Sequence, residues 1–225
     1  MGQDKQPKER QRRELERARQ HRRVACERIL IVSEGSKTEP LYFDEIRTAL
    51  RLPVRNITVS GGQLGTDPVQ VVQYAKDLFE HGDPHKGIEP RAFDRIFAVF
   101  DRDEHRGYFD ALRQAEALDG KLKNGEKHRV PFKAIASVPC FELWLLLHFQ
   151  DVQAPLQRDE ALQRLCQHYP DYEKGSTGVF AATRSGLEEA MQRAETLATR
   201  FSADMAPQPF TDVVKLVKLL TNLRR

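Results

Sequence analysis

Cysteine is scarce and scattered in this 225-residue sequence. The three cysteines, Cys26, Cys140 and Cys166, form no Cys-x-x-Cys pair and show no Cys/His spacing typical of a zinc site. The pattern argues against a disulfide framework and against structural zinc. It predicts a reducing, cytoplasmic location.

Long hydrophobic runs are also missing. No apolar stretch approaches the roughly 18 residues needed to cross a bilayer, so we expect no contact with a membrane. The first residues are basic and lack the apolar core and cleavage site of a secretory signal. With 40% hydrophobic and 31% charged residues, the chain resembles an ordinary globular protein, and its length suits one main body with extensions.

Positive charge is concentrated at the N-terminus. Residues 1–28 contain ten Lys or Arg and five acids, a net charge of +5, whereas the remainder carries −2. We therefore predict a basic arm over residues 1–27, helical or disordered. Such an arm could grip phosphates, because each neutralised phosphate releases counterions; a solvated arm without a ligand is an equal alternative. The candidate nucleic-acid-binding residues of the arm are Arg12, Arg13, Arg17, Arg22 and Arg23.

Apolar strands alternate with amphipathic helices in the first two thirds of the chain. This alternation predicts an α/β fold with an open, mostly parallel sheet flanked by helices. The strands are expected at residues 28–33, 54–60, 95–100 and 132–137, and the helices from residue 38, over 67–81 and over 108–122.

The remainder of the chain is predicted to be helical. We expect a core over residues 28–150 and a helical C-terminal extension over 151–225 packed on it. The expected helices of this part cover residues 141–149, 158–169, 180–201 and 211–223.

Acidic residues follow two of the predicted strands. Ligands of an open parallel sheet bind beyond the carboxyl ends of the strands, and Glu34, Asp101 and Asp103 fall at such ends. On an extended segment, Asp101 and Asp103 would face one side and share a divalent ion; oxygen ligands suit Mg²⁺ or Mn²⁺. Glu34 could complete the site or move a proton, and Gly35 would let a phosphate backbone approach closely. Solvated or helix-capping carboxylates are the alternative.

Four further residues are candidates for the same site. Lys37 could contact phosphate, although a solvated loop lysine is the ordinary case. Glu39 could join the metal site, but stabilisation of a first helical turn explains it equally well. His105 could shuttle a proton or contact phosphate. Lys174 would flank a cleft only if the C-terminal helices fold back over the strand ends.

Several motifs resemble known families. An apolar strand ending in Glu34-Gly35, followed by a strand ending in Asp101-Arg102-Asp103, resembles the Toprim domain of topoisomerases, bacterial primases and OLD-type nucleases. Four longer blocks, which together span about residues 28–220, are similar to the RloB-like family. These blocks are residues 33–43, 99–105, 137–149 and 209–217.

The resemblance implies a Toprim-like nuclease encoded near restriction or other phage-defence genes, often beside an ATPase. It implies a general acid/base or metal-positioning role for Glu34 and a metal-binding role for Asp101 and Asp103. Glu142 would be a further acidic ligand, although the helix dipole also explains an acid at the start of an apolar helix. His148, on the same helix, is predicted to be packed.

The acidic residues at the strand ends predict a Mg²⁺- or Mn²⁺-dependent nuclease that hydrolyses phosphodiester bonds in DNA or RNA. The resemblance adds a role in anti-phage defence and an ATPase partner to this expectation. The alternative is a catalytically inactive module that binds nucleic acid or a partner. Primase-like nucleotidyl transfer would need nucleotide-binding elements that the sequence does not display, and topoisomerase action would need a tyrosine-bearing domain.

Overall fold

The computed structural model describes residues 27–53, 57–61 and 67–223. The basic arm and its five candidate arginines lie outside these ranges, as does the start of the second predicted strand. None of the helices in the described part of the chain is both long and apolar enough to cross a bilayer.

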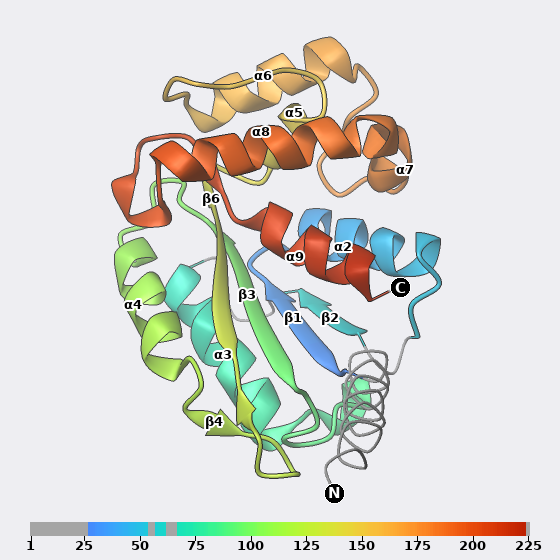
Figure 1. Cartoon of the computed structure of the whole chain (residues 1–225), viewed down its shortest axis with the longest axis vertical. Coiled ribbons are helices and arrows are strands. Elements are labelled where there is room, and N and C mark those ends of the chain that lie inside the picture. The colour runs from blue at the N-terminus through green and yellow to red at the C-terminus, as the bar shows by residue number, and fades with distance from the viewer. Residues whose placement is uncertain (1–26, 54–56, 62–66, 224–225) are drawn as a thin grey trace, which may run out of the picture.

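A five-stranded sheet forms the centre of the molecule (Figure 1). Its strand order is β2-β1-β3-β6-β7; β2, β1, β3 and β6 are parallel, and β7 is antiparallel to β6. The mostly parallel α/β prediction is therefore confirmed. The strands of this sheet are β1 (Ile29–Ser33), β2 (Ile57–Gly61), β3 (Arg95–Asp101), β6 (Phe132–Val138) and β7 (Phe210–Thr211). A separate hairpin pairs β4 (Leu122–Lys123) with β5 (Arg129–Val130).

Helices cover both faces of the sheet and extend beyond one end of it (Figure 1). Short 3-10 turns occupy Pro84–Lys86, Arg184–Gly186 and Ala203–Met205. The α-helices are α2 (Thr38–Ala49), α3 (Pro68–His81), α4 (Tyr108–Leu118), α5 (Glu142–Leu146), α6 (Arg158–His168), α7 (Val179–Thr183), α8 (Leu187–Arg200) and α9 (Val213–Asn222).

The side chains of β1 divide between two apolar clusters. Ile29 and Ile31 pack with α2, α5 and α9, whereas Leu30 and Val32 pack with α3 and α4. Successive side chains of a strand point to opposite faces, so a central strand covered on both faces must be apolar throughout. The first cluster also includes Leu197 of α8, so the C-terminal helices and the sheet share one core.

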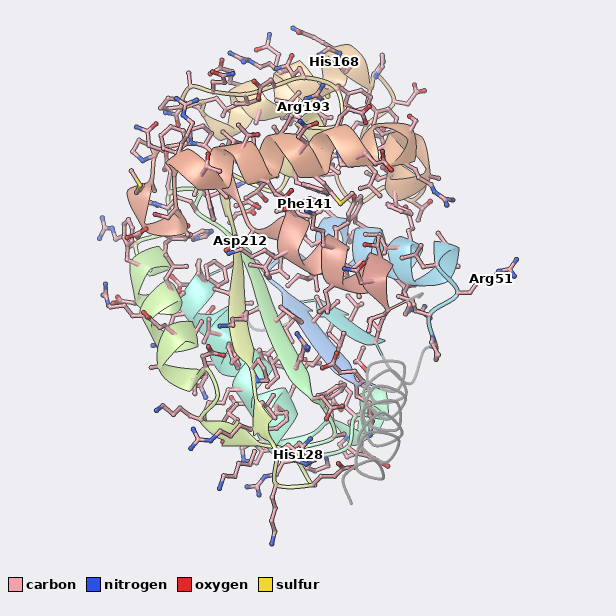
Figure 2. The ribbon with its side chains drawn as sticks, viewed as in Figure 1. Arg51, His128, Phe141, His168, Arg193 and Asp212 are labelled. Atoms are coloured by element: carbon pink, nitrogen blue, oxygen red, sulfur yellow. The ribbon has the colours of Figure 1, made fainter. Side chains whose placement is uncertain are left out.

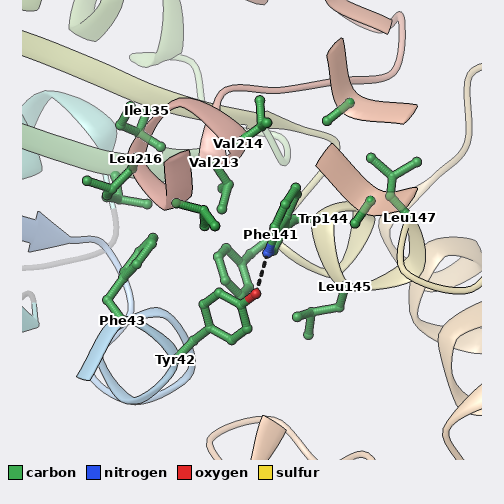
Figure 3. Close-up of a cluster of buried hydrophobic side chains, with 14 of the residues drawn as sticks. Tyr42, Phe43, Ile135, Phe141, Trp144, Leu145, Leu147, Val213, Val214 and Leu216 are labelled. Carbon is green, nitrogen blue, oxygen red and sulfur yellow. Dashed lines mark hydrogen bonds between the residues drawn. The ribbon is translucent and has the colours of Figure 1, made fainter. Parts of the chain in front are cut away.

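The packed centre of α5 joins the sheet to the C-terminal helices. Trp144 is fully buried, and its indole Nε1–H donates a hydrogen bond of 2.8 Å to the hydroxyl of Tyr42 in α2 (Figure 3). Phe141 packs edge-to-face against the ring of Tyr42. Arg193 lies on α8 (Figure 2). At the other end of α5, its guanidinium donates to the carbonyl of Leu147 at 2.6 Å.

The predicted helix over residues 180–201 is wrong, because it is broken into α7, a 3-10 turn and α8. The break lies at Gly186, where an added Cβ would stand 2.3 Å from the carbonyl oxygen of His148. Close approach of this backbone, together with the turn before α8, gives the segment a geometry that helical periodicity does not reveal.

Two other helix predictions are corrected at their ends. Residues 210 and 211 form strand β7, where the hydroxyls of Thr211 and Ser137 lie 3.1 Å apart, and the helix starts only at Val213. The helix predicted over 108–122 ends at Leu118, because Gly120 has a positive φ of 65° and Leu122 pairs in β4. Pairing with neighbouring strands overrides local propensity at both places.

Candidate functional site

Glu34 and Asp101 lie side by side at the carboxyl edge of the sheet. Ser33, the last residue of β1, is in register with Val99 of β3, so the two strands end close together. The backbone N–H of Asp101 donates to Glu34 Oε2 at 3.2 Å, and the N–H of Glu34 donates to the Val99 carbonyl at 2.9 Å. The predicted meeting of these strand ends is therefore present.

Asp103 reaches the site by a turn. Its φ of 33° corrects the expectation of an extended segment. Its N–H donates to the carbonyl of Pro139, in the loop after β6, at 3.0 Å. The turn also brings His105 Nε2 to 3.0 Å from Glu34 Oε1. One oxygen or nitrogen atom each of Glu34, Asp103 and His105 lies within 4.8 Å of the others.

Glu142 approaches from the neighbouring strand β6, at the first position of α5. It is only 3% exposed, and its Oε1 accepts hydrogen bonds from the Tyr172 hydroxyl at 3.1 Å and from Lys174 Nζ at 3.0 Å. Burial opposes its ionisation, but Lys174 and the neighbouring hydrogen bonds hold its pKa below the ordinary value. Glu142 is thus a buried carboxylate kept in its charged form.

The C-terminal part does fold back over the strand ends, which was the condition for Lys174 to join the site. The N–H of Gly175 donates to Thr38 Oγ1 at 3.0 Å, which ties the loop after α6 to the start of α2. Lys37 is exposed, and its aliphatic chain packs against Gly175. In this structure Lys37 helps to position the loop that carries Lys174.

Glu39 belongs to the acidic cluster. It is 7% exposed, and burial, reinforced by Glu142 and Glu34, raises its pKa to about 7. A Cβ added to Gly35 would lie 2.2 Å from Glu39 Oε2. Gly35 was expected to admit a phosphate backbone, but here the group that approaches it is the carboxylate of Glu39.

Asp101 is the most strongly perturbed acid of the cluster. Its pKa lies well above the ordinary value, first because the group is buried and then because Glu39, Glu142, Glu34 and Asp103 repel its charge. Burial likewise raises the pKa of Glu34 and of Asp103. Several carboxylates that cannot all ionise together are stabilised as anions by a bound cation.

Arg158, the first residue of α6, was missed in the sequence. Its guanidinium forms an ion pair with Asp103 Oδ2, and it opposes the burial effect on the pKa of Asp103. The other carboxylate oxygen, Asp103 Oδ1, is buried and accepts no hydrogen bond within the described residues. No sequence signal distinguishes Arg158 from a solvated arginine of a first helical turn.

An open hollow of about 510 Å³ leads to these groups. Its walls include Glu34, Asp103 and His105 from the sheet edge, and Gln157 and Arg158 from the start of α6. The carboxylates of Glu34 and Asp103, with the unpartnered Asp103 Oδ1, fit a hard divalent cation such as Mg²⁺ or Mn²⁺, and His105 offers one ring nitrogen. The arrangement could therefore hold a cation beside a pocket open to a ligand.

Comparisons with known proteins give one match. A family model described as RloB-like protein matches residues 29–220, which is most of the chain. No curated protein and no solved structure matches the chain. The matched region contains the sheet, the acidic cluster and the C-terminal segments that carry Arg158 and Lys174. The chain belongs to the RloB-like family.

Proposed function

We propose that this protein is a Mg²⁺- or Mn²⁺-dependent nuclease that hydrolyses phosphodiester bonds in DNA or RNA, with a Toprim-like catalytic core. The observation that carries the proposal is the buried charge conflict at Asp101, whose carboxylate faces the negative fields of four other acids. Protonation or a bound cation relieves such a conflict, and carboxylates with strongly raised pKa values beside a pocket are typical of functional sites.

The residues divide into three roles. Asp101 and Asp103 would hold the cation, with Glu34 completing the site from β1. A divalent cation at such a site neutralises charge on the phosphate oxygens and activates water. The contact of 3.0 Å between His105 Nε2 and Glu34 Oε1 would let this pair orient the attacking water and hold its proton. Glu142 and Glu39 would supply further negative charge around the cation.

Electrostatics favour catalysis over the alternative of a module that only binds nucleic acid. Five acids lie close together at this edge of the sheet, and two of them, Glu34 and Asp103, line the hollow. Their charge repels a phosphate backbone, so a binder without a cation gains nothing from them. The basic arm over residues 1–27 would provide the phosphate grip. Its deletion should then weaken nucleic-acid binding and reduce the salt dependence of the affinity.

Membership of the RloB-like family supports a further proposal about context. We place the nuclease in anti-phage defence, acting with an ATPase partner. Deleting the gene, or introducing Asp101→Asn, should abolish protection in a plaque assay of a host that carries the complete locus. Equal numbers of plaques on the wild-type and variant hosts would contradict the defence role but would leave the proposed nuclease activity standing.

Cleavage assays test the nuclease itself. Labelled DNA and RNA are incubated with Mg²⁺, Mn²⁺ or EDTA and with wild type, Glu34→Gln, Asp101→Asn or Asp103→Asn. Each substitution should lower the cleavage rate by at least about a hundredfold, because it removes a cation ligand or the group that positions water. Asp110→Asn, a change of the same type at an exposed position of α4, is the matched control and should retain full activity.

The outcome separates the two functions. A wild type that binds nucleic acid and never cleaves it, with either metal and with its ATPase partner present, would be a binding module. Cleavage that survives Asp101→Asn would show that the acidic cluster is not the catalytic centre.

A further inference from the structure

Two positively charged side chains from the C-terminal part of the chain form ion pairs with carboxylates of the acidic cluster. Arg158, at the start of α6, pairs with Asp103, and Lys174, in the loop after α6, pairs with Glu142. Both contacts cross from the helical end of the molecule to the edge of the sheet. They partly neutralise the site without a metal ion.

The surroundings of the two cations differ. Lys174 shares its acceptor, Glu142 Oε1, with the Tyr172 hydroxyl, and its loop is fixed to α2 through Gly175 and Thr38. Arg158 is 50% exposed and lines the hollow together with Glu34 and His105. The loop that carries Lys174 is thus tied down, whereas the half-exposed side chain of Arg158 borders the open hollow.

A divalent cation bound to Asp103 would compete with Arg158 for the carboxylate. The guanidinium occupies Asp103 Oδ2, and the remaining oxygen, Oδ1, has no hydrogen-bond donor in the described part of the chain. A cation that binds Asp103 through Oδ1 brings a second positive charge close to the guanidinium, and the repulsion between them weakens the Arg158 contact. The released guanidinium then stands at the wall of the open hollow, where its planar donors match the geometry of a phosphate group.

A second hollow of about 590 Å³ adjoins the first. Asp103, Pro139 and Gln157 line both, so Arg158 stands beside their junction. Arg102 lines the second hollow and donates from Nη1 to the carbonyls of Asp103 and His105. Within the described residues it forms no ion pair with a carboxylate. A chain of phosphates passing from one hollow to the other would meet positive charge next to the acidic cluster.

We propose that Arg158 is a phosphate-binding residue that is stored on Asp103 and transfers to a phosphate of the substrate when a divalent cation occupies the site. The inference rests on the proposed nuclease function and adds to it a substrate-positioning residue from α6. It makes the start of α6 the element that responds to metal loading. No covalent bond changes in this exchange, in which one ion pair is replaced by another.

The exchange predicts opposite effects of one substitution on two ligands. Without nucleic acid, Arg158→Ala should bind Mn²⁺ about fivefold more tightly than wild type in calorimetry, because the competitor for Asp103 is gone. With Ca²⁺ present, the same variant should bind a labelled oligonucleotide about tenfold more weakly in fluorescence anisotropy, because a charge-assisted contact to phosphate is lost. Arg158→Lys should stay near wild type for Mn²⁺ and fall between the two for the oligonucleotide.

Arg113→Ala is the control, since Arg113 is exposed, pairs with Asp110 of its own helix α4 and lines neither hollow. It should leave both affinities unchanged, which separates a specific exchange from a general loss of positive charge. Urea unfolding of each variant verifies that Arg158→Ala is folded.

The results distinguish two failures. If wild type and Arg158→Ala bind Mn²⁺ equally, or if Arg158→Ala leaves oligonucleotide affinity unchanged, the exchange is overturned while the nuclease proposal stands. If neither protein binds Mn²⁺ at all, the metal site fails and the exchange fails with it. Tighter Mn²⁺ binding combined with weaker oligonucleotide binding supports both.

Discussion

The two ends of α5 solve the problem of a buried ionisable group in opposite ways. Glu142 at the start of the helix and His148 just past its end are 3% and 6% exposed. Lys174 and neighbouring donors keep Glu142 charged. Burial lowers the pKa of His148 to about 4, so this ring is neutral at physiological pH. The comparison teaches that partners decide the charge state when burial is equal.

The partners themselves differ in kind. The Nδ1–H of His148 donates to the carbonyls of Trp144 and Leu145, at 3.0 and 3.2 Å, and its Nε2 is buried without a hydrogen-bond partner within the described residues. Glu142 faces a cation and a hydroxyl across the site. The Nδ1–H of the histidine is satisfied by its own helix, as expected for a packed residue, whereas the ion pair of the glutamate comes from a loop distant in the sequence.

The largest effect on stability is expected from removing Trp144, the buried residue between the two ends of α5. Trp144→Ala should lower the free energy of unfolding by about 3–5 kcal/mol, because a fully buried indole and its bond to Tyr42 are lost. Urea unfolding followed by circular dichroism measures the change. Phe109→Ala, at a position 36% exposed on α4, is the control and should cost far less. Equal losses would mean that α5 is not the packed centre of the molecule.

The histidine end can be tested by pH. The folded pKa of about 4 lies below the ordinary 6.5, so its stability contribution is complete above pH 6.5 and is lost as the pH falls toward 4. Wild type should lose about 2 kcal/mol more than His148→Asn between pH 7 and pH 5. The asparagine retains a donor for the helix carbonyls but cannot be protonated. Unfolding curves of both proteins that change in parallel with pH would contradict a buried neutral histidine.

The glutamate end depends on its cation. Lys174→Ala should cost about 1–2 kcal/mol at pH 7, since it leaves a buried carboxylate without its ion pair and the lysine itself is partly exposed. It should also raise the pKa of Glu142. Lys218→Ala, which breaks an exposed pair with Glu195, is the matched control and should cost less than about 0.5 kcal/mol. The comparison fails if the two lysine variants have the same stability.

The smallest effect concerns the neutral donor to the same oxygen. Tyr172→Phe removes only the hydroxyl bonded to Glu142 Oε1 and should cost about 1 kcal/mol. The loss should be smaller than that of Lys174→Ala in the same urea experiment. A reversed order would show that the hydroxyl, and not the charge, holds Glu142 ionised.

The sequence predicted the sheet and the meeting of Glu34 with the acids at the end of β3 and just after it, because the patterns involved are local. A continuous apolar strand implies cover on both faces, and parallel strands end at one edge. The positions where helices break were harder to predict from the sequence. Gly186 and Thr211 take their conformations from contacts with His148 and with β6, which no local pattern records.

The features of the site that could not be predicted from the sequence are ion pairs between residues far apart in the chain. Asp103 and Arg158 are 55 residues apart, and an arginine in a first helical turn looks solvated. The turn at Asp103, with its φ of 33°, likewise depends on a hydrogen bond to Pro139 beyond β6.

By itself, the sequence determined which residue types stand at the strand ends, because strand periodicity and the polarity of the following turns are written in neighbouring residues. Only the tertiary structure decided which charges oppose them: Arg158 on Asp103, Lys174 on Glu142, and Glu39 over Gly35. The physical reason is that electrostatic energy depends on distance and burial in space. Both are set when the C-terminal helices pack over the edge of the sheet.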